Sequence, residues 1–267
     1  PRPDTYRPLW TRSDGTLDTE AYLRFYDLYL DRATANDVAG FCLEPIQGWG
    51  GTVMPSDDFF PKLRRFCDER GLLLMADEVL TGWGRCGQWL CMDRWGVVPD
   101  VVTLGKGFGN GFPVTCVAVR EPHKERFEQI SASSSYGGNP MACAAALAST
   151  EVIEQENLLE HARHLGDVAL QRMRRMKQEH RLIGDVRGAG CLLGIELVRD
   201  RDTKEPFPEA GTLVYQKAFG NGLAWIPAGH ILRMSPPIVM DERALLKGLD
   251  IIDESIGETE RELIGRE

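Results

Sequence analysis

Hydrophobic positions in the first half of the chain follow two alternating spacings. In residues 17–32 and 55–71 they recur every three or four positions, which is the spacing of amphipathic helices. Between and after these stretches come short runs that are apolar throughout. Buried runs separated by helices indicate a mainly parallel sheet covered by helices on both faces, which is the α/β class. The runs that we predict as strands are residues 38–46, 72–77, 100–105 and 113–119.

Local signals mark the two ends of the helix predicted at residues 55–71. Ser56 or Asp57 can accept a hydrogen bond from the first free N–H groups of this helix, so we expect one of them to cap it. Gly71 can adopt the left-handed conformation in which helices often end.

The second half of the chain has a different pattern. Residues 139–178 look helical, and residues 183–198 are predicted to form a turn interrupted by glycines that leads into a strand. A helix ended by Gly222 and a closing helix capped by Asp241 follow, with two short strands predicted between them. We therefore divide the chain into residues 1–150, a part of a large α/β domain, and residues 151–267, a smaller α+β domain.

Composition narrows the classes of partner. Forty acidic residues against 31 basic ones give a net charge of −9, which argues against nucleic acid and against a membrane surface as partners. The seven cysteines are scattered, no two of them have CxxC spacing, and we expect neither a metal site nor a disulfide framework. The sequence has no apolar run long enough for a membrane span, and we expect a cytoplasmic protein.

Polar residues gather where the predicted strands end. Asp77 ends one strand, and Lys106 follows the next strand inside a glycine-rich turn. Ligands collect at this edge of a parallel sheet. A desolvated lysine amine can condense with an aldehyde, and a buried carboxylate needs a positive partner. Pyridoxal 5′-phosphate meets both requirements, because its aldehyde binds lysine and its pyridine nitrogen is held protonated by an acid. We expect Glu78 to be structural, pairing with Arg85.

Five stretches together make the sequence similar to a known family. In order and spacing, "LLLMADEVLTGWGRCG", "PDVVTLGKGFGNGFPVTCVAV", "SYGGNPMACAAALASTEVIEQENL", "IGDVRGAGCLLGIELV" and "LRMSPPIVM" resemble the class III (omega) aminotransferases, which are pyridoxal-phosphate enzymes of fold type I. The similarity runs over nearly the whole chain. The 29 positions from Asp77 to Lys106, with so many matches around them, make it specific.

The resemblance implies a role for each matching residue. Lys106 would bind the cofactor and carry a proton during catalysis, and Asp77 would contact the pyridine nitrogen. Arg233 matches the arginine that takes a substrate carboxylate. Three further residues would contact the cofactor: Val79 on one ring face, Gln47 near its phenolic oxygen, and Ser135, in place of the usual threonine, at the phosphate of a neighbouring subunit.

The chain departs from the family pattern in two ways. Trp49 stands where members that handle a side-chain amine often have a glutamate that masks the arginine, so we expect a bulky apolar wall and an arginine that stays available. The family also extends well before the first residue of this chain, and the glycine-serine turn that grips the phosphate lies in that part. We expect a homodimer, or a hetero-oligomer with a companion chain that supplies this part.

The resulting hypothesis is an aminotransferase that moves an amino group from an amino acid or amine to a 2-oxo acid. An amino-acid racemase or epimerase and a decarboxylating transaminase share the same scaffold and the same lysine and aspartate. A non-catalytic structural subunit of a larger assembly is the alternative from another class. The sequence does not identify the amino donor, the acceptor or the stereochemistry.

Overall fold

The computed structural model describes residues 1–35, 37–129, 134–226 and 228–263, without the side chains of residues 126–129. Contacts between residues divide the chain into two compact units. Unit 1 consists of Pro1–Gln47, Val53–Trp83 and Gln88–Glu156, and unit 2 of Gly48–Thr52, Gly84–Gly87 and Asn157–Glu267.

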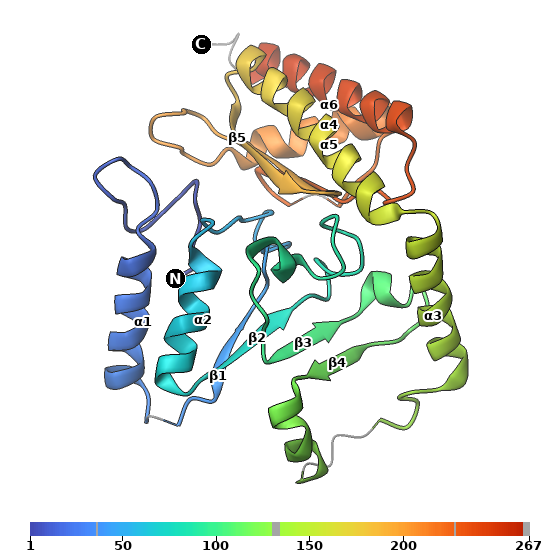
Figure 1. Cartoon of the computed structure of the whole chain (residues 1–267). Coiled ribbons are helices and arrows are strands. Elements are labelled where there is room, and N and C mark those ends of the chain that lie inside the picture. The colour runs from blue at the N-terminus through green and yellow to red at the C-terminus, as the bar shows by residue number, and fades with distance from the viewer. Residues whose placement is uncertain (36, 130–133, 227, 264–267) are drawn as a thin grey trace. The chain divides into compact units, whose positions relative to one another are not determined.

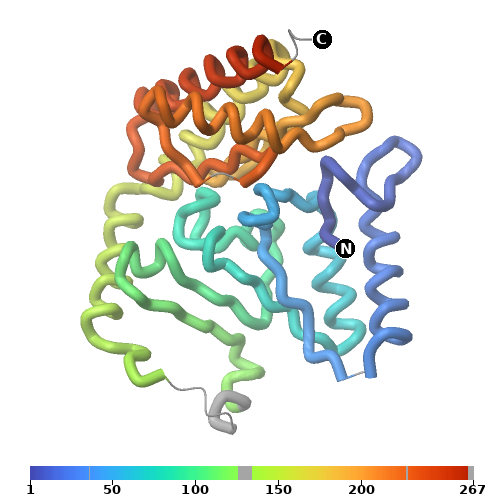
Figure 2. The backbone as a smooth tube through the Cα atoms, turned by 180° about the vertical axis from the view of Figure 1, so that it is seen from behind, coloured from blue at the N-terminus to red at the C-terminus, as the bar shows by residue number. Residues whose placement is uncertain are grey.

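Unit 1 is built around a four-stranded sheet in the order β1-β2-β3-β4 (Figure 1). The strands β1, β2 and β3 are parallel, as the apolar runs predicted, and β4 is antiparallel to β3. Figure 2 follows the same succession of strands from the opposite side. The strands are β1 (Gly40–Leu43), β2 (Leu73–Asp77), β3 (Val101–Leu104) and β4 (Cys116–Val119), and the α-helices are α1 (Thr19–Ala33), α2 (Phe59–Arg70) and α3 (Pro140–Gln155).

Helix α2 packs its apolar face on the sheet. Phe59, Phe60 and Leu63 are buried with Leu74 of β2 in one hydrophobic cluster. The predicted cap of this helix is wrong, because Asp58 occupies the N-cap position. The carboxylate of Asp58 accepts hydrogen bonds from the Ser56 hydroxyl (2.8 Å) and from a threonine of α1. It therefore joins the starts of two helices. Gly71 ends the helix with a φ of 67°, as expected.

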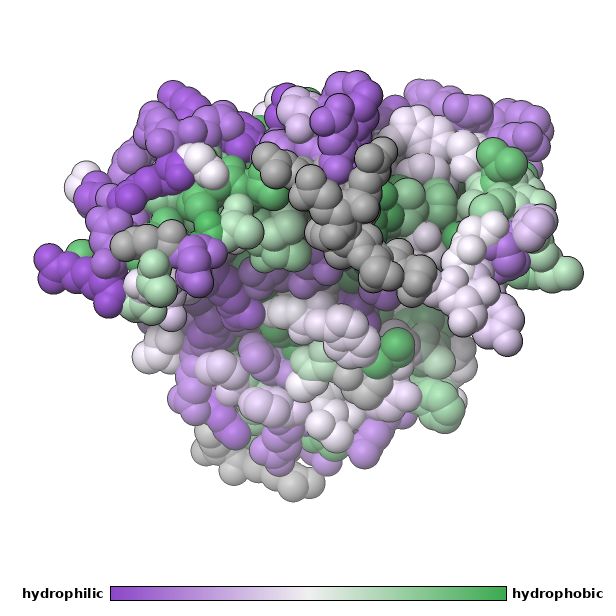
Figure 3. All heavy atoms as spheres, turned by 90° about the horizontal axis from the view of Figure 1, so that it is seen from below, coloured by the Kyte–Doolittle hydropathy of each residue, from purple (hydrophilic) through white to green (hydrophobic). Residues whose placement is uncertain are grey.

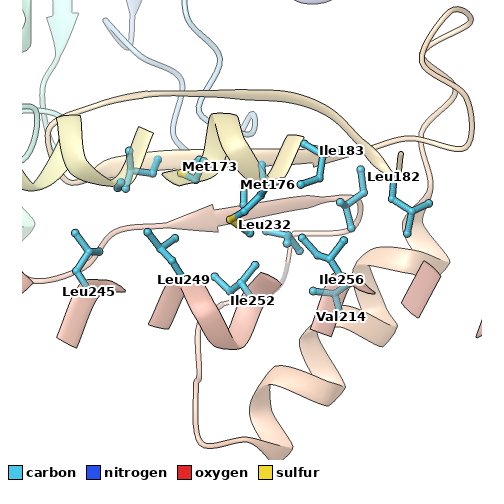
Figure 4. Close-up of a cluster of buried hydrophobic side chains, with 14 of the residues drawn as sticks. Met173, Met176, Leu182, Ile183, Val214, Leu232, Leu245, Leu249, Ile252 and Ile256 are labelled. Atoms are coloured by element: carbon cyan, nitrogen blue, oxygen red, sulfur yellow. The ribbon is translucent and has the colours of Figure 1, made fainter. Parts of the chain in front are cut away.

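Unit 2 is an antiparallel sheet in the order β5-β6-β7, packed with three helices. Every residue of β6 is buried. Figure 4 shows the core, in which Met173 and Met176 of α4, Leu232 of β7, and Leu249 and Ile252 of α6 belong to one buried hydrophobic cluster. The elements are α4 (Leu158–Glu179), β5 (Ile183–Ala189), β6 (Leu192–Leu197), α5 (Pro208–Gly220), β7 (Ile231–Met234) and α6 (Glu242–Leu263).

Two predictions for unit 2 concern the strands in residues 223–240 and the cap of α6. Of the two short strands predicted in residues 223–240, one is confirmed as β7, and the other described residues of that range form no second strand. Asp241 does cap α6, since its carboxylate accepts hydrogen bonds from the N–H groups of Arg243 (2.9 Å) and Ala244 (3.2 Å).

No helix in the described part of the chain combines the length and the apolar character that a membrane span requires. On the face that Figure 3 displays, hydrophilic and hydrophobic residues are intermingled.

His180 ties the end of α4 to α6. Its Nδ1 lies 2.9 Å from the Glu260 carboxylate and its Nε2 lies 2.7 Å from the Asp253 carboxylate. The ring packs on the α6 backbone, because a Cβ added at Gly257 would lie 3.3 Å from the ring carbon Cε1. The hydrogen bond with Glu260 and the one with Asp253 raise the pKa of His180. The arrangement stabilises the doubly protonated, charged ring.

We expect this contact to make stability fall as the pH rises. A histidine whose pKa is raised by folding contributes its full stabilisation below its unfolded pKa, about 6.5, and loses it as the pH passes the folded pKa. The loss is expected to be about 1.5–3 kcal/mol of unfolding free energy, the contribution of a hydrogen bond to a charged group. Urea unfolding between pH 5 and pH 9 measures it, and His180→Gln should flatten the profile.

The matched control is His164→Gln. His164 also joins α4 to α6, through the Glu242 carboxylate (2.7 Å), but both side chains are largely exposed. An exposed pair contributes little. The account of His180 is contradicted when the two variants change the pH profile of stability equally.

Candidate functional site

The ends of β2 and β3 bring the two principal candidate residues to the same edge of the sheet. Asp77 is aligned with Thr103 in the parallel register. The N–H of Glu78 donates to the Thr103 carbonyl (3.0 Å), so the pairing continues past the end of β2. β3 then ends at Leu104 and is followed by Gly105 and Lys106. Asp77 and Lys106 therefore lie at the ends of neighbouring parallel strands, on the same edge of the sheet.

Asp77 is half-buried, and one of its oxygens is already occupied. Its Oδ1 accepts hydrogen bonds from the Val79 N–H (3.1 Å) and from the Thr103 hydroxyl (3.3 Å). Its Oδ2 accepts no hydrogen bond from any residue that the structure describes. The carboxylate is thus held in place through one oxygen, while the other is available to a ligand.

Lys106 is an exposed side chain on a strained backbone. Its φ is 47°, in the left-handed region that residues other than glycine rarely adopt. This conformation costs on the order of 1 kcal/mol and persists only when the surroundings enforce it. Here the Lys106 carbonyl accepts hydrogen bonds from the N–H groups of Gly109 (3.2 Å) and Asn110 (3.1 Å). Strain of this kind is common where a side chain must point toward a ligand.

Helix α3 and two aromatic rings support the turn that carries Lys106. The Ser149 hydroxyl of α3 donates to the Gly107 carbonyl (3.2 Å). The rings of Trp83 and Phe108 meet edge to face at 4.8 Å, and the Trp83 indole donates to the Thr150 hydroxyl of α3 (3.3 Å). The turn is therefore anchored to rigid elements at two points.

The Lys106 side chain faces open space, and an apolar residue packs against the backbone that precedes it. It lines an open hollow of about 570 Å³ together with Gly111–Thr115. A Cβ added at Gly105 would lie 3.3 Å from Cγ1 of Val79, so the valine packs against the backbone just before the lysine. The site thus has an amine, a fixed carboxylate and an apolar side chain near the edge of the sheet at which β2 and β3 end.

Two of the other candidates, Gln47 and Ser135, also belong to unit 1. Gln47 pairs through its backbone with Val53, with two N–H···O bonds of 3.1 Å, and its side chain is half-buried. Ser135 is exposed in the turn before α3. Asn139 caps that helix, since its side chain accepts from the Ala142 N–H (3.0 Å).

Arg233 and Trp49, both in unit 2, contact each other. The guanidinium carbon of Arg233 lies 4.3 Å from the centre of the Trp49 ring. Arg233 is only 8% exposed, and its Nε is buried without a hydrogen-bond partner in the described part of the chain. None of the acidic side chains that the structure describes pairs with it. Buried guanidinium groups are normally paired, so Arg233 is suited to bind an anion.

The structure corrects the expected partner of Glu78 and reveals one buried ion pair that the sequence did not indicate. Glu78 accepts hydrogen bonds from the Thr81 hydroxyl and the Met92 N–H (2.8 Å), and burial raises the pKa of its carboxyl. Arg85 donates instead to the Cys191 carbonyl (3.2 Å), so the predicted pair is wrong. The ion pair that the sequence did not indicate joins Arg187 to Glu196 at 2.7 Å. The spacing of the two residues in the sequence gives no sign of this contact.

The sequence of the chain is similar to those of known proteins. The sequence model of the family Aminotransferase class-III matches residues 13–256. The chain is 37% identical to the leucine/methionine racemase of Thermococcus litoralis, over 100% of this chain and 60% of the relative. It is 34% identical to the 4-aminobutyrate aminotransferase GabT of Escherichia coli, over 92% of this chain and 59% of the relative.

A solved structure shows the same similarity in three dimensions. An amine transaminase from an uncultivated Pseudomonas species, in its PLP-bound form, superposes with a TM-score of 0.89 at 29% identity. The match covers 96% of this chain and 60% of that one. The chain thus spans about 60% of the length of the relatives that it matches.

Proposed function

Because the chain belongs to the class III aminotransferase family and has the α/β fold of its solved relatives, fold type I, we propose that it forms part of a pyridoxal-phosphate-dependent aminotransferase. The reaction proposed is transfer of an amino group from an amino acid or amine to a 2-oxo acid. The cofactor-binding part would be residues 1–150, and residues 151–267 would form the small domain.

The residues at the strand edge fit pyridoxal phosphate. The free Oδ2 of Asp77 can accept a hydrogen bond from a protonated ring nitrogen, and an adjacent carboxylate favours that charged form by about 1–3 pKa units. The exposed amine of Lys106 can bind the aldehyde. Val79 supplies an apolar surface for one ring face. When bound, the cofactor supplies an electron sink for the charge that develops on the substrate carbon.

The residues of this chain supply the proton transfer. With the cofactor and the substrate bound, Lys106 Nζ would be the base that accepts the proton leaving the substrate carbon. Its rigid turn keeps the amine close to that carbon, which lowers the entropic cost of the step. Asp77 keeps the ring nitrogen protonated throughout. We assign Gln47 to the phenolic oxygen of the cofactor.

Arg233 is proposed to bind the carboxylate of the substrate. Guanidinium groups bind carboxylates through two parallel N–H···O bonds in the plane of the group. The Trp49 ring lies against this group, with its centre 4.3 Å from the guanidinium carbon, and Nε of Arg233 has no hydrogen-bond partner among the described residues. The pair therefore suits substrates that carry a carboxylate.

The proposal of a homodimer rests on Ser135. Its exposed hydroxyl, before the N-terminus of α3, is assigned to the phosphate of the cofactor in a neighbouring subunit. A companion chain has no support in the comparisons, since none of the relatives named above is described as a two-chain enzyme. A cytoplasmic location stays a prediction from the sequence.

The observation that carries the proposal is the position of Asp77 and Lys106 at one edge of adjacent parallel strands. The test incubates the holoenzyme with single enantiomers of amino acids, with and without pyruvate. We expect alanine to form only when pyruvate is present, with the optical purity of the donor unchanged, as measured by chiral chromatography.

Other outcomes of the same test select the alternatives. Loss of optical purity without any 2-oxo acid would replace the proposal by a racemase or epimerase, the activity named for the Thermococcus relative. Release of carbon dioxide together with amino transfer would indicate a decarboxylating transaminase. Absence of all three reactions in a cofactor-loaded protein would favour a structural subunit.

A further inference from the structure

Three residues form a row across the sheet of unit 2. Arg187 of β5 is aligned with Gly194 of β6, and Gly194 is aligned with Arg233 of β7. Aligned residues of antiparallel strands project their side chains from the same face. The two arginines therefore share a face, with a residue that has no side chain between them.

The Gly48–Thr52 turn occupies the space above Gly194. A Cβ added at Gly194 would lie 3.1 Å from the Thr52 Cβ, and the Thr52 hydroxyl donates to the Leu193 carbonyl (3.2 Å). Gly51 is pressed against β7 as well, since a Cβ there would lie 2.2 Å from Cδ1 of Ile231. The turn thus lies flat on the sheet between the two arginines.

Arg187 holds this turn by its backbone. Its Nε donates to the carbonyls of Gly51 (3.1 Å) and Thr52 (3.0 Å), and its Nη2 donates to Gly51 (2.7 Å). On the opposite side, Nη1 lies 2.9 Å from Asp185 and 2.7 Å from Glu196. Burial opposes its charge, but these two carboxylates outweigh burial and raise the pKa of Arg187.

The geometry of Arg187 is specific to arginine. Only a planar fork with several fixed donors can bind two neighbouring carbonyls and two carboxylates at once, and a lysine ammonium cannot reproduce it. The side chain is 7% exposed, so these contacts are made away from water, where they are strongest.

The turn that Arg187 holds carries Trp49. This side chain is 62% exposed, yet its ring lies over the Arg233 guanidinium at 4.3 Å. Cation–π contacts contribute about 0.5–2 kcal/mol, too little to fix a mobile turn by themselves. The position of the ring therefore depends on the backbone beneath it.

We infer that Arg187 is a positioning residue for the carboxylate site: it fixes the Gly48–Thr52 turn and thereby holds the Trp49 ring over the Arg233 guanidinium. The inference rests on the proposed function of Arg233. It assigns the selectivity for carboxylate substrates to a buried residue that does not itself contact them.

The test uses Arg187→Lys in the holoenzyme, with two acceptors of similar size. Pyruvate carries a carboxylate and propanal does not. We expect kcat/KM for pyruvate to fall about tenfold because KM rises, a change that corresponds to the free energy of one cation–π contact. The kcat for pyruvate and the reaction with propanal should change less than about twofold. Trp49→Ala should have the same effect, and the double variant should lose no more than either single one.

The control is Arg172→Lys, which alters an arginine of α4 that is paired with Asp250 and Asp253 of α6. It should leave both acceptors unchanged. Additive losses in the double variant, or equal losses for pyruvate and propanal, would overturn the inference.

An inactive wild-type protein would remove the proposed function but not the inference, because a crystal structure of Arg187→Lys then decides. Trp49 displaced from Arg233 supports the role of Arg187. Trp49 still stacked on Arg233 overturns it.

Discussion

Replacing Lys106 by alanine is expected to lower kcat of the transamination by about 10⁴-fold, the upper end of what a positioned acid–base group contributes. The substitution removes the only group that we assign both to binding the cofactor aldehyde and to accepting the substrate proton. Fold stability should stay close to wild type, because the side chain is exposed and makes no contact that the core needs. Single-turnover kinetics with pyruvate as acceptor measures the loss.

Lys124→Ala is the matched control for this variant. Lys124 is an exposed lysine of unit 1 that pairs with Glu121. Its loss should change kcat by less than about twofold, as for most surface substitutions. A Lys106→Ala enzyme with wild-type activity would favour the structural-subunit alternative.

Asp77→Asn has the second-largest expected effect, a fall in kcat of about 10²–10³-fold. The amide cannot keep a pyridine nitrogen protonated, and a loss of 2–3 pKa units corresponds to a rate factor of this size. The amide oxygen can still accept the hydrogen bonds from Val79 and Thr103, so the strand end should remain folded. Steady-state kinetics, together with the amount of cofactor bound per chain, separates the two effects.

The cofactor content makes this prediction specific. Asp77→Asn should still carry cofactor on Lys106 while reacting slowly, whereas Asp57→Asn, which alters an exposed carboxylate before α2, should behave as wild type. Full activity in Asp77→Asn would mean that the ring nitrogen does not meet this carboxylate.

The sequence predicted the parts of the structure that depend on local patterns. The apolar runs located β1 to β4, and the order of elements gave the parallel sheet and the edge where ligands collect. Gly71 and Asp241 marked helix ends because each acts on its own helix. Asp77 and Lys106 could be paired because neighbouring parallel strands end on the same side.

Long-range contacts could not be predicted in this way. Asp58, rather than Ser56 or Asp57, occupies the N-cap position of α2, and its carboxylate accepts a hydrogen bond from a threonine of α1 instead of capping the helix. Glu78 accepts hydrogen bonds from Thr81 and from Met92, which lies further along the chain than the expected partner Arg85. The contact of Trp49 with Arg233 joins residues 184 positions apart in the sequence and depends on a buried arginine on a third segment.

The proposed function requires the carboxylate of Asp77 and the amine of Lys106 to converge on the same pyridine ring. A crystal structure of the protein with pyridoxal phosphate tests it most directly. We expect the cofactor bonded to Lys106, with Asp77 Oδ2 about 2.7–2.9 Å from the ring nitrogen, the length of a charge-assisted hydrogen bond. A cofactor bound to another residue, or an Asp77 carboxylate out of reach of the ring nitrogen, would contradict the account.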